Sequence, residues 1–295
     1  MAVLGIDLGA TKISAALFDS EGNFLERRYS LLEGRGGNEA GDFICSVIAS
    51  LCKNFKVEGA GICVPGIVYS KKGTVWAPNI PGWDDYPLLE KLRSALGNIR
   101  VEIESDRTCY ILGEKWKGAA RDCSNAIYLA VGSGIGAGIL LDGRVIHGAN
   151  DIVGATGWMA LEGDYDKDWD RCGCFETFAS GNGIGYQATK LYGRNVSSYQ
   201  VFEDFSKGVE PAVKVISKAV QMWGKGAANL VSLFNPEIIV FGGGVFSGPP
   251  KELIPDIYAE AQKWAQPIAI RTVRFCASEV GSDAALLGAG YLVAR

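Results

Sequence analysis

Two glycine-containing turns, each set inside an apolar stretch, are the parts of this sequence best suited to bind a ligand. The first stretch is residues 3–18, with its turn at residues 9–11; the second is residues 127–141, with its turn at residues 132–134. Each pattern predicts a buried strand, a small-residue turn and a second strand. Because glycine lets a backbone approach an anion closely, the N–H groups of such a turn can point at a phosphate. The pair of hairpins therefore predicts two halves of the chain that face one nucleotide.

Neither turn has the spacing of a familiar phosphate-binding loop. No GxxxxGK[ST] sequence occurs, and neither turn matches GxGxxG followed by a helix, because a strand follows each one. A tight hairpin without a ligand is an equally good interpretation of either turn alone. Asp7, at the end of the first apolar segment, favours the nucleotide interpretation.

The elements that must position these turns follow the same order twice. In the first half we expect three strands within residues 2–31, then helices at 38–55 and 84–96 and strands at 59–64 and 101–104. In the second half we expect strands at 125–131 and 237–241, a hairpin at 139–146, and helices at 176–192, 209–234, 251–264 and 284–294. This repetition predicts an internally duplicated α/β fold with a central cleft between its halves. The boundary is expected just after Asp106.

The composition predicts a folded chain and disfavours some classes of partner. The 295 residues are 48% hydrophobic and 21% charged, which predicts a folded chain with a substantial core. The net charge of −4, with no block of Lys and Arg, disfavours nucleic acid and charged membranes as partners. No signal peptide or membrane-spanning stretch is visible, so a cytoplasmic protein is expected. Most of the eight cysteines are then expected to be reduced core residues.

Motifs that carry a family resemblance occur in order along the whole chain. They are Gly5-Ile6-Asp7-Leu8-Gly9-Ala10-Thr11-Lys12, Val64-Pro65-Gly66-Ile67-Val68, Ala77-Pro78-Asn79-Ile80-Pro81-Gly82-Trp83, Gly132-Ser133-Gly134-Ile135-Gly136, Gly173-Cys174-Phe175-Glu176 to Ser180-Gly181, Asn235-Pro236-Glu237 to Gly242-Gly243-Gly244-Val245, and Leu287-Gly288-Ala289. With these motifs the chain resembles the ROK family of sugar kinases, within the actin/hexokinase/Hsp70 superfamily.

The resemblance implies an internally duplicated, two-lobed actin-like ATPase (ribonuclease H-like) fold, with ATP, Mg²⁺ and a sugar between lobes that close. It implies an N-terminal lobe of residues 1–106, joined by the C-terminal helix 284–295, and a C-terminal lobe of residues 107–283. ROK repressors carry an additional helix-turn-helix domain before the first strand. Since this chain begins at that strand, a kinase is expected. The family also suggests a homodimer.

The resemblance assigns roles to individual residues. Asp106 is expected to be the base that activates the acceptor hydroxyl, with a helix N-cap as the alternative. Asp7 is expected to hold Mg²⁺ through water, with a turn residue as the alternative. The other cofactor-binding positions are Gly9, Thr11, Lys12, Ser133 and Gly134 at the phosphates, and Gly242, Gly243 and Gly244 at the adenosine. The substrate-binding positions are Gly66 (backbone), Asn79, Ser105, Asp106, Trp158 and Glu176.

Some of these positions have a plain structural alternative. Lys12 could equally be a solvated lysine, and residues 242–244 an ordinary strand-to-helix connection. Trp83 could pack on a sugar face but is at least as well explained as a core residue. Amide and carboxylate groups such as Asn79 and Glu176 suit a polyol, because each sugar hydroxyl both donates and accepts a hydrogen bond.

The sequence departs from the family pattern at the sugar site. Ser105 stands where the family has Asn, and Ser133 stands where it usually has Thr. Ala155 and Trp158 replace the Glu and His that serve the anomeric end of the sugar in the family. A buried site that lacks hydrogen-bond partners discriminates against unmatched hydroxyls. We therefore expect weak use of plain glucose, or a ketose, an amino or deoxy sugar, or a cyclitol as substrate.

The family's zinc site is also altered. Family zinc uses that His and three Cys, whereas here the segment is residues 167–174 and only Cys174 stands in its place. The one histidine, His147, lies elsewhere in the sequence and is expected to be a surface residue or a local hydrogen-bonding group. Because tetrahedral zinc needs four ligands, no structural zinc is expected. Packing of Trp158 and Trp169 is a hypothesis for what holds the segment instead.

Together these features predict an ATP- and Mg²⁺-dependent sugar kinase with an atypical sugar pocket. It would transfer the γ-phosphoryl group to a hydroxyl, O6 in a hexose. The alternative is a sugar-binding sensor of the same fold with weak or no catalysis, which the changes at Ser105, Ala155 and Trp158 favour and the presence of Asp7 and Asp106 disfavours. A chaperone-like ATPase fits poorly, because no peptide-binding domain is present.

Overall fold

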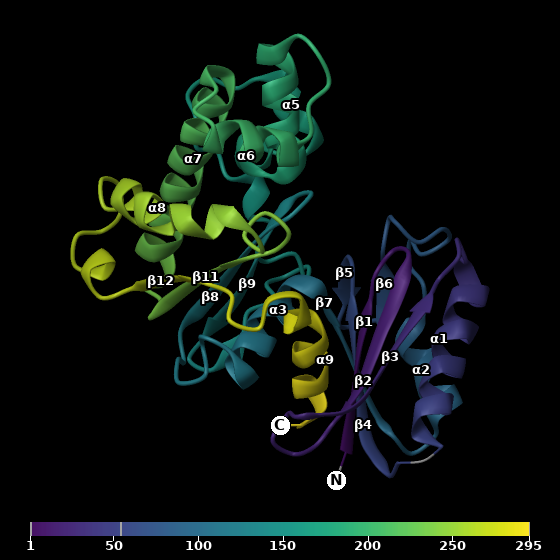
Figure 1. The fold of residues 1–295 in the computed structure, drawn as a ribbon. Coiled ribbons are helices and arrows are strands. Elements are labelled where there is room, and N and C mark those ends of the chain that lie inside the picture. Colours follow the sequence, from purple (N-terminus) through teal and green to yellow (C-terminus); the bar gives the residue numbers. More distant parts are fainter. Residues whose placement is uncertain (1, 54, 295) are drawn as a thin grey trace. The chain divides into compact units, whose positions relative to one another are not determined.

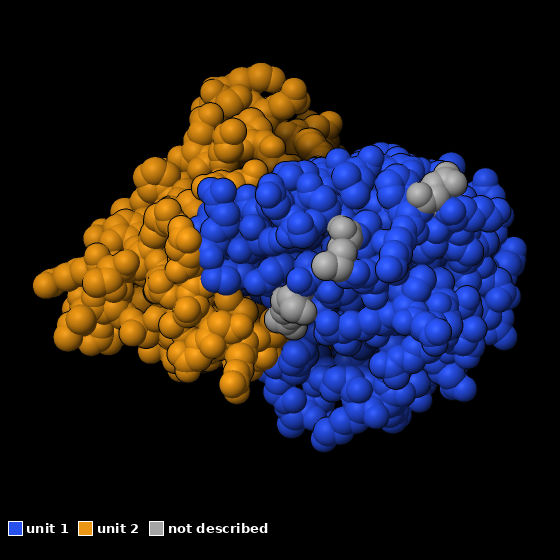
Figure 2. Space-filling model, turned by 90° about the horizontal axis from the view of Figure 1, so that it is seen from below, with its two compact units in different colours: residues 1–121, 147–153, 283–295 blue, residues 122–146, 154–282 orange. Residues whose placement is uncertain are grey.

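The computed structural model describes residues 2–53 and 55–294, and the chain divides into two compact units (Figure 2). Unit 1 comprises residues 1–121, 147–153 and 283–295, and unit 2 comprises residues 122–146 and 154–282. The boundary expected after Asp106 falls after Arg121 instead. The reason is that helix α3 (Asp106–Lys117) packs against α9 (Ala284–Ala294), an apolar helix from the other end of the chain.

Unit 1 is built on a five-stranded sheet with the order β3-β2-β1-β4-β7 (Figure 1). The strands are β1 (Ala2–Leu8), β2 (Lys12–Phe18), β3 (Phe24–Leu31), β4 (Val57–Val64) and β7 (Arg100–Ser105). The first three are antiparallel, whereas β4 and β7 run parallel to β1. Because parallel strands end at the same edge of a sheet, this topology brings Asp7 and Asp106 to one edge, with β4 between them.

Helices cover both faces of this sheet (Figure 1). Helices α1 (Gly37–Cys52) and α2 (Leu88–Leu96) lie on one face, where Ile44, Ile48 and Leu51 of α1 join the core. Helices α3 and α9 lie on the other. A Cβ atom at Gly61 would overlap the backbone of Ala289, so glycine lets α9 lie directly on the sheet. A short hairpin of β5 (Ile67–Tyr69) and β6 (Thr74–Trp76) follows β4.

Unit 2 repeats this sheet plan with the order β10-β9-β8-β11-β12. Its strands are β8 (Ala126–Val131), β9 (Ile135–Leu141), β10 (Arg144–Val145), β11 (Ile238–Gly242) and β12 (Arg274–Ala277). As in unit 1, three antiparallel strands are followed by two that run parallel to the first. The duplication that the sequence predicts is therefore present in both sheets.

The helices of unit 2 differ from the prediction in three places. They are α4 (Cys174–Ala179), α5 (Gly181–Tyr192), α6 (Ser198–Ser206), α7 (Glu210–Phe234) and α8 (Ile254–Ala261). The single helix expected at 176–192 is divided at Ser180, whose side chain accepts the Gly183 N–H and caps α5. Helix α6 was not predicted. Within residues 2–53 and 55–294, no helix has the length and apolar character needed to cross a membrane.

Short 3₁₀ helices connect these elements. They lie at Thr156–Trp158 (η1), Lys167–Arg171 (η2), Pro249–Leu253 (η3), Ala269–Arg271 (η4) and Gly281–Asp283 (η5). The helix expected at 251–264 therefore begins within η3, continues as α8 and ends at Ala261, three residues earlier than predicted.

Candidate active site

Two carboxylates lie at the carboxyl edge of the unit 1 sheet. Asp7 is near the end of β1 and pairs in register with Cys63 on β4, and Asp106 is the first residue of α3, directly after β7. Burial raises the pKa of Asp7, while a hydrogen bond from the Cys63 thiol and the charge of Lys12 oppose that shift. The charge of Asp7 also contributes to the raised pKa of Asp106.

Asp106 has the properties of a general base. Burial raises its pKa to about 6, against the opposing effects of the Arg107 guanidinium and backbone N–H. The residue in the N-cap position is Ser105, not Asp106, and Asp106 Oδ1 accepts the N–H of Arg107 at 2.8 Å. A carboxylate with this pKa is ionised at neutral pH and still basic enough to accept a proton from a hydroxyl.

The first glycine turn exposes two side chains of unit 1. The Gly9 N–H bonds to the Lys12 carbonyl at 2.8 Å and closes the turn, and the side chains of Thr11 and Lys12 are exposed beside it. Asn79 is also exposed, in the loop after β6. These side chains are free to meet a ligand.

Three other residues of unit 1 have polar groups that already bond within the fold. The Ser105 hydroxyl is buried and bonds to Thr108 Oγ1 at 3.2 Å. The Gly66 N–H is used by the Val64 carbonyl at 2.9 Å. Trp83 is a core residue: it is 1% exposed, stacks on Tyr86 and donates its indole N–H to Gly37. The core alternative for Trp83 therefore holds.

His147 lies in the segment 147–153, which belongs to unit 1. Its Nε2 is 2.6 Å from Glu104 Oε2. A surface residue or a local hydrogen-bonding group was expected, but this partner is distant in sequence. Asp151 of the same segment accepts hydrogen bonds from the hydroxyl and N–H of Ser70. These contacts explain why a segment flanked on both sides by unit 2 packs with unit 1.

The second glycine turn is held by Glu176 of unit 2. The Gly132 N–H bonds to the Gly134 carbonyl at 2.9 Å, and Glu176 Oε2 accepts the Ile135 N–H at 2.7 Å. A Cβ atom at Gly134 or at Gly157 would lie within 3 Å of this carboxylate, so only glycine leaves room for it. Burial raises the pKa of Glu176, and the Ile135 N–H opposes the shift. One oxygen of Glu176 is therefore committed to the turn.

A cavity of about 320 Å³ opens beside this turn in unit 2. It is lined by Gly132, Ser133, Gly181, Asn182, Ser198, Tyr199, Phe202, Gly244, Val245, Ser247, Gly248, Pro249 and Pro250. Of the residues predicted to bind the cofactor in this half, Ser133 and Gly244 line the cavity. Gly242 and Gly243 instead pack closely on Tyr128 and Val131. Gly134 contacts Glu176.

The aromatic wall of this cavity was not predicted from the sequence. Tyr199 and Phe202 lie on α6, and Tyr199 is 81% exposed. A local signal was available: Ser197 and Gln200 form a capping box, in which each side chain bonds to the backbone N–H of the other. This S-x-x-Q spacing marks the start of α6.

Comparison with known proteins places the chain in a family. The sequence profile described as "ROK family" matches residues 3–295. The chain belongs to the ROK family. It is 30% identical to the glucokinase of Halalkalibacterium halodurans, over 98% of this chain and 94% of that protein. It is 27% identical to the N-acetyl-D-glucosamine kinase of Escherichia coli, over 98% of each chain.

Solved structures confirm the actin-like fold class expected for a ROK protein. The ROK hexokinase from Thermus thermophilus superposes with a TM-score of 0.89 at 29% identity, over 99% of this chain and 98% of that one. The ROK glucokinase from Streptomyces griseus, in complex with glucose and AMPPNP, gives a TM-score of 0.78 at 27% identity, over 99% of each chain.

Residues 167–174, the segment aligned with the family's zinc site, lie in unit 2. Among residues 2–53 and 55–294, no three or more His, Cys, Asp or Glu side chains come together as metal ligands. The hypothesis that Trp158 and Trp169 pack together is wrong for Trp158, which is 58% exposed. Trp169 packs on Phe178 instead, with the ring centres 6.2 Å apart.

Proposed function

We propose that this ROK protein is an ATP- and Mg²⁺-dependent sugar kinase. The observation that carries the proposal is Asp106, a carboxylate of pKa about 6 at the carboxyl edge of the unit 1 sheet. The relatives named glucokinase and N-acetyl-D-glucosamine kinase, and the AMPPNP complex of a ROK glucokinase, support the same reaction class.

In this mechanism Asp106 accepts the proton of the acceptor hydroxyl as the hydroxyl oxygen attacks the γ-phosphorus of ATP. The bond from that phosphorus to the β–γ bridging oxygen breaks, and ADP leaves with the bridging oxygen. Phosphoryl transfer depends mainly on positioning and on neutralising phosphate charge. Thr11, Lys12, Ser133 and Gly134 are proposed to contact phosphate oxygens. Asn79 would hold a sugar hydroxyl.

Mg²⁺ suits the acidic pair of unit 1. The charge of Asp7 contributes to the raised pKa of Asp106, and a cation near Asp7 would relieve that repulsion. Mg²⁺ keeps several waters and takes its other ligands from phosphates, so one carboxylate is a sufficient protein contribution. When bound, the ion would neutralise phosphate charge, and Asp7 would hold it through water.

The cavity beside the second glycine turn is proposed to hold the adenosine. Gly244 and Gly132 let the ligand approach the backbone, and Tyr199 and Phe202 offer faces on which a nucleobase can stack. The cavity volume of about 320 Å³ lies in the range of small-molecule sites.

We propose the 6-hydroxyl as the acceptor in a hexose, and a sugar pocket that differs from that of ordinary glucokinases. Ala155 and Trp158 cannot supply the carboxylate and imidazole that the family resemblance places at the anomeric end. One oxygen of Glu176 is already used by Ile135. The preferred substrate would then be a ketose, an amino or deoxy sugar, or a cyclitol.

An ADP-release screen with ATP and Mg²⁺ tests this proposal against hexoses, ketoses, amino sugars and cyclitols. Turnover is expected with at least one of them, and turnover of plain glucose is expected to be weak. No turnover with any acceptor would overturn the kinase and leave a sugar-binding sensor. Glucose turnover equal to that of an ordinary glucokinase would overturn the altered pocket alone.

A further inference from the structure

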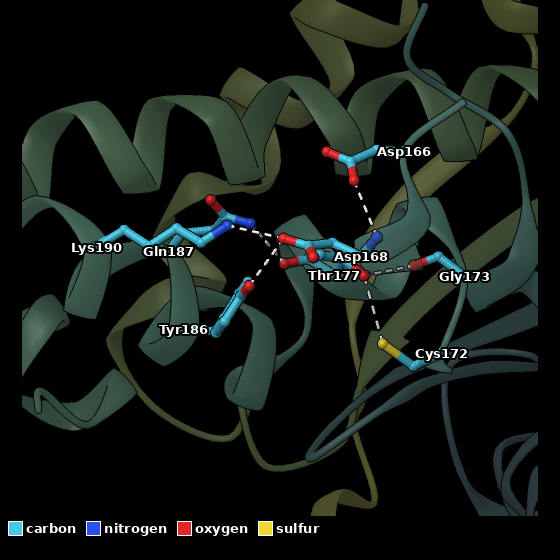
Figure 3. Close-up of polar contacts among 8 residues, drawn as sticks. All are labelled: Asp166, Asp168, Cys172, Gly173, Thr177, Tyr186, Gln187 and Lys190. Atoms are coloured by element: carbon cyan, nitrogen blue, oxygen red, sulfur yellow. Dashed lines mark hydrogen bonds and ion pairs between the residues drawn. The ribbon is translucent and has the colours of Figure 1, made fainter. Parts of the chain in front are cut away.

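The segment that replaces the family's zinc site is held by polar contacts (Figure 3). Cys172 and Cys174 are its only cysteines, and the Cys172 thiol hydrogen-bonds to Glu176. The Cys172 thiol lies 3.4 Å from Thr177 Oγ1, and Cys174 is buried at the start of α4. These contacts join the segment to α4 but not to α5.

Asp168 attaches the segment to α5. Its Oδ2 accepts the Tyr186 O–H at 2.9 Å and lies 3.1 Å from Lys190 Nζ, so one carboxylate oxygen joins η2 to two residues of α5 (Figure 3). The Lys190 ammonium lies 4.3 Å from the centre of the Tyr186 ring, which adds a cation–π contact. The hydrogen bonds from Lys190 and Tyr186 lower the pKa of Asp168 and keep it charged.

The same segment is attached to α4 by its other end. The Trp169 carbonyl accepts the Gly173 N–H at 2.7 Å, and the Gly173 carbonyl accepts the Thr177 hydroxyl at 2.8 Å. The Thr177 carbonyl in turn accepts Gln187 Nε2 at 3.2 Å, which ties α4 to α5 (Figure 3). Helix α4 carries Glu176, one residue before Thr177. A continuous set of contacts therefore leads from Asp168 to the helix of Glu176.

We propose that Asp168, Tyr186 and Lys190 form a metal-free clasp that positions Glu176 for the sugar. The expected effect of the clasp on the sugar rests on the proposed kinase function. The expected effect on the structure of the segment does not. Asp168 is a positioning residue, since it acts on Glu176 through η2 and α4. The Asp168 and Lys190 side chains are 49% and 50% exposed, so the clasp is expected to weaken as salt rises.

The first experiment asks whether metal has any part in holding the segment. The purified protein is incubated with 1,10-phenanthroline, dialysed, and analysed for zinc and thermal unfolding. Substoichiometric zinc and an unchanged unfolding temperature are expected. Stoichiometric zinc, or a lower unfolding temperature that added zinc restores, would overturn the clasp.

The second experiment compares Asp168→Ala with Asp170→Ala. Asp170 lies in the same 3₁₀ helix but accepts a hydrogen bond from Tyr165, just before the segment, and not from α5, so it is a matched control. Deuterium uptake of residues 165–177 is expected to increase in Asp168→Ala alone. The KM for the sugar is expected to rise about threefold, the scale of an exposed ion pair, with kcat nearly unchanged. Asp168→Asn, which keeps an acceptor for Tyr186, should restore part of the effect.

The outcomes separate the clasp from the proposed function. Uptake and zinc content are measured without any sugar, so they test the clasp even if no substrate is found. Equal deuterium uptake in the Asp168 and Asp170 variants would overturn the clasp. Greater uptake with an unchanged KM would show that the clasp does not position Glu176.

Discussion

Asp106 connects function and stability in a single residue. Its pKa of about 6 in the folded protein lies above the ordinary aspartate value of about 3.9. Because the pKa of Asp106 is raised in the folded protein, ionising Asp106 costs more there than in the unfolded chain. The free energy of unfolding therefore falls as pH rises from about 4 to about 6, and it stays lower above pH 6. The deficit amounts to at most about 3 kcal/mol at neutral pH.

The variant Asp106→Asn is therefore expected to be inactive and more stable. Loss of the base should lower kcat by about 10³-fold, within the range for general-base catalysis. The free energy of unfolding at pH 8 should rise by about 2 kcal/mol, whereas at pH 4 it should change little. ADP release and denaturant unfolding at both pH values measure this. Asp122→Asn, at an exposed carboxylate, is the control. If the Asp106 variant retained activity, Asp106 would not be the base.

The pH dependence of the wild-type enzyme gives an independent test of the same group. A base must be deprotonated to act, so kcat/KM should rise with pH through about 6 and then level off. Initial rates at limiting sugar and saturating Mg·ATP measure this profile. A rate that falls as pH rises through this range would contradict the role of Asp106.

At the scale of elements, α9 is joined to the unit 1 sheet by close backbone contact. A Cβ atom at Gly61 would overlap the carbonyl of Ala289. Because the overlapping atoms belong to the backbone, no flexible side chain can move aside to relieve the overlap. Gly61→Ala is expected to lower the free energy of unfolding by about 2 kcal/mol or more, as overpacking does. Denaturant unfolding measures this, with Gly163→Ala as the control, because nothing lies near a Cβ there.

Helix α6 is the element on which we expect the base of the nucleotide to stack. Replacing Tyr199 by Ala removes a stacking face worth about 1–3 kcal/mol per base, so the KM for ATP should rise about tenfold. Since Tyr199 is 81% exposed, the unfolding temperature should not change. Tyr199→Phe keeps the ring and should behave like the wild type. An unchanged KM in Tyr199→Ala would show that the base does not stack there.

At the scale of the whole molecule, local signals were enough for the sheets but not for the division of the chain. The hairpins β1–β2 and β8–β9 are predicted from short apolar runs around small-residue turns, because a hairpin is a local structure. The division after Arg121 depends on α3 packing against α9, and no pattern within α3 reveals that partner. The segment 147–153 likewise belongs to unit 1, because His147 contacts Glu104 and Asp151 accepts a hydrogen bond from Ser70. Both partners are distant in sequence.

The sequence by itself determined the ROK family, the duplicated fold and the positions of Asp7 and Asp106, because motif order and apolar periodicity are written along the chain. Only the tertiary structure decided the raised pKa of Asp106, the use of Glu176 by the second glycine turn, and the clasp of Asp168 on α5. Each of these depends on burial or on contacts between residues far apart in sequence. Such distances are set by packing, which no local pattern encodes.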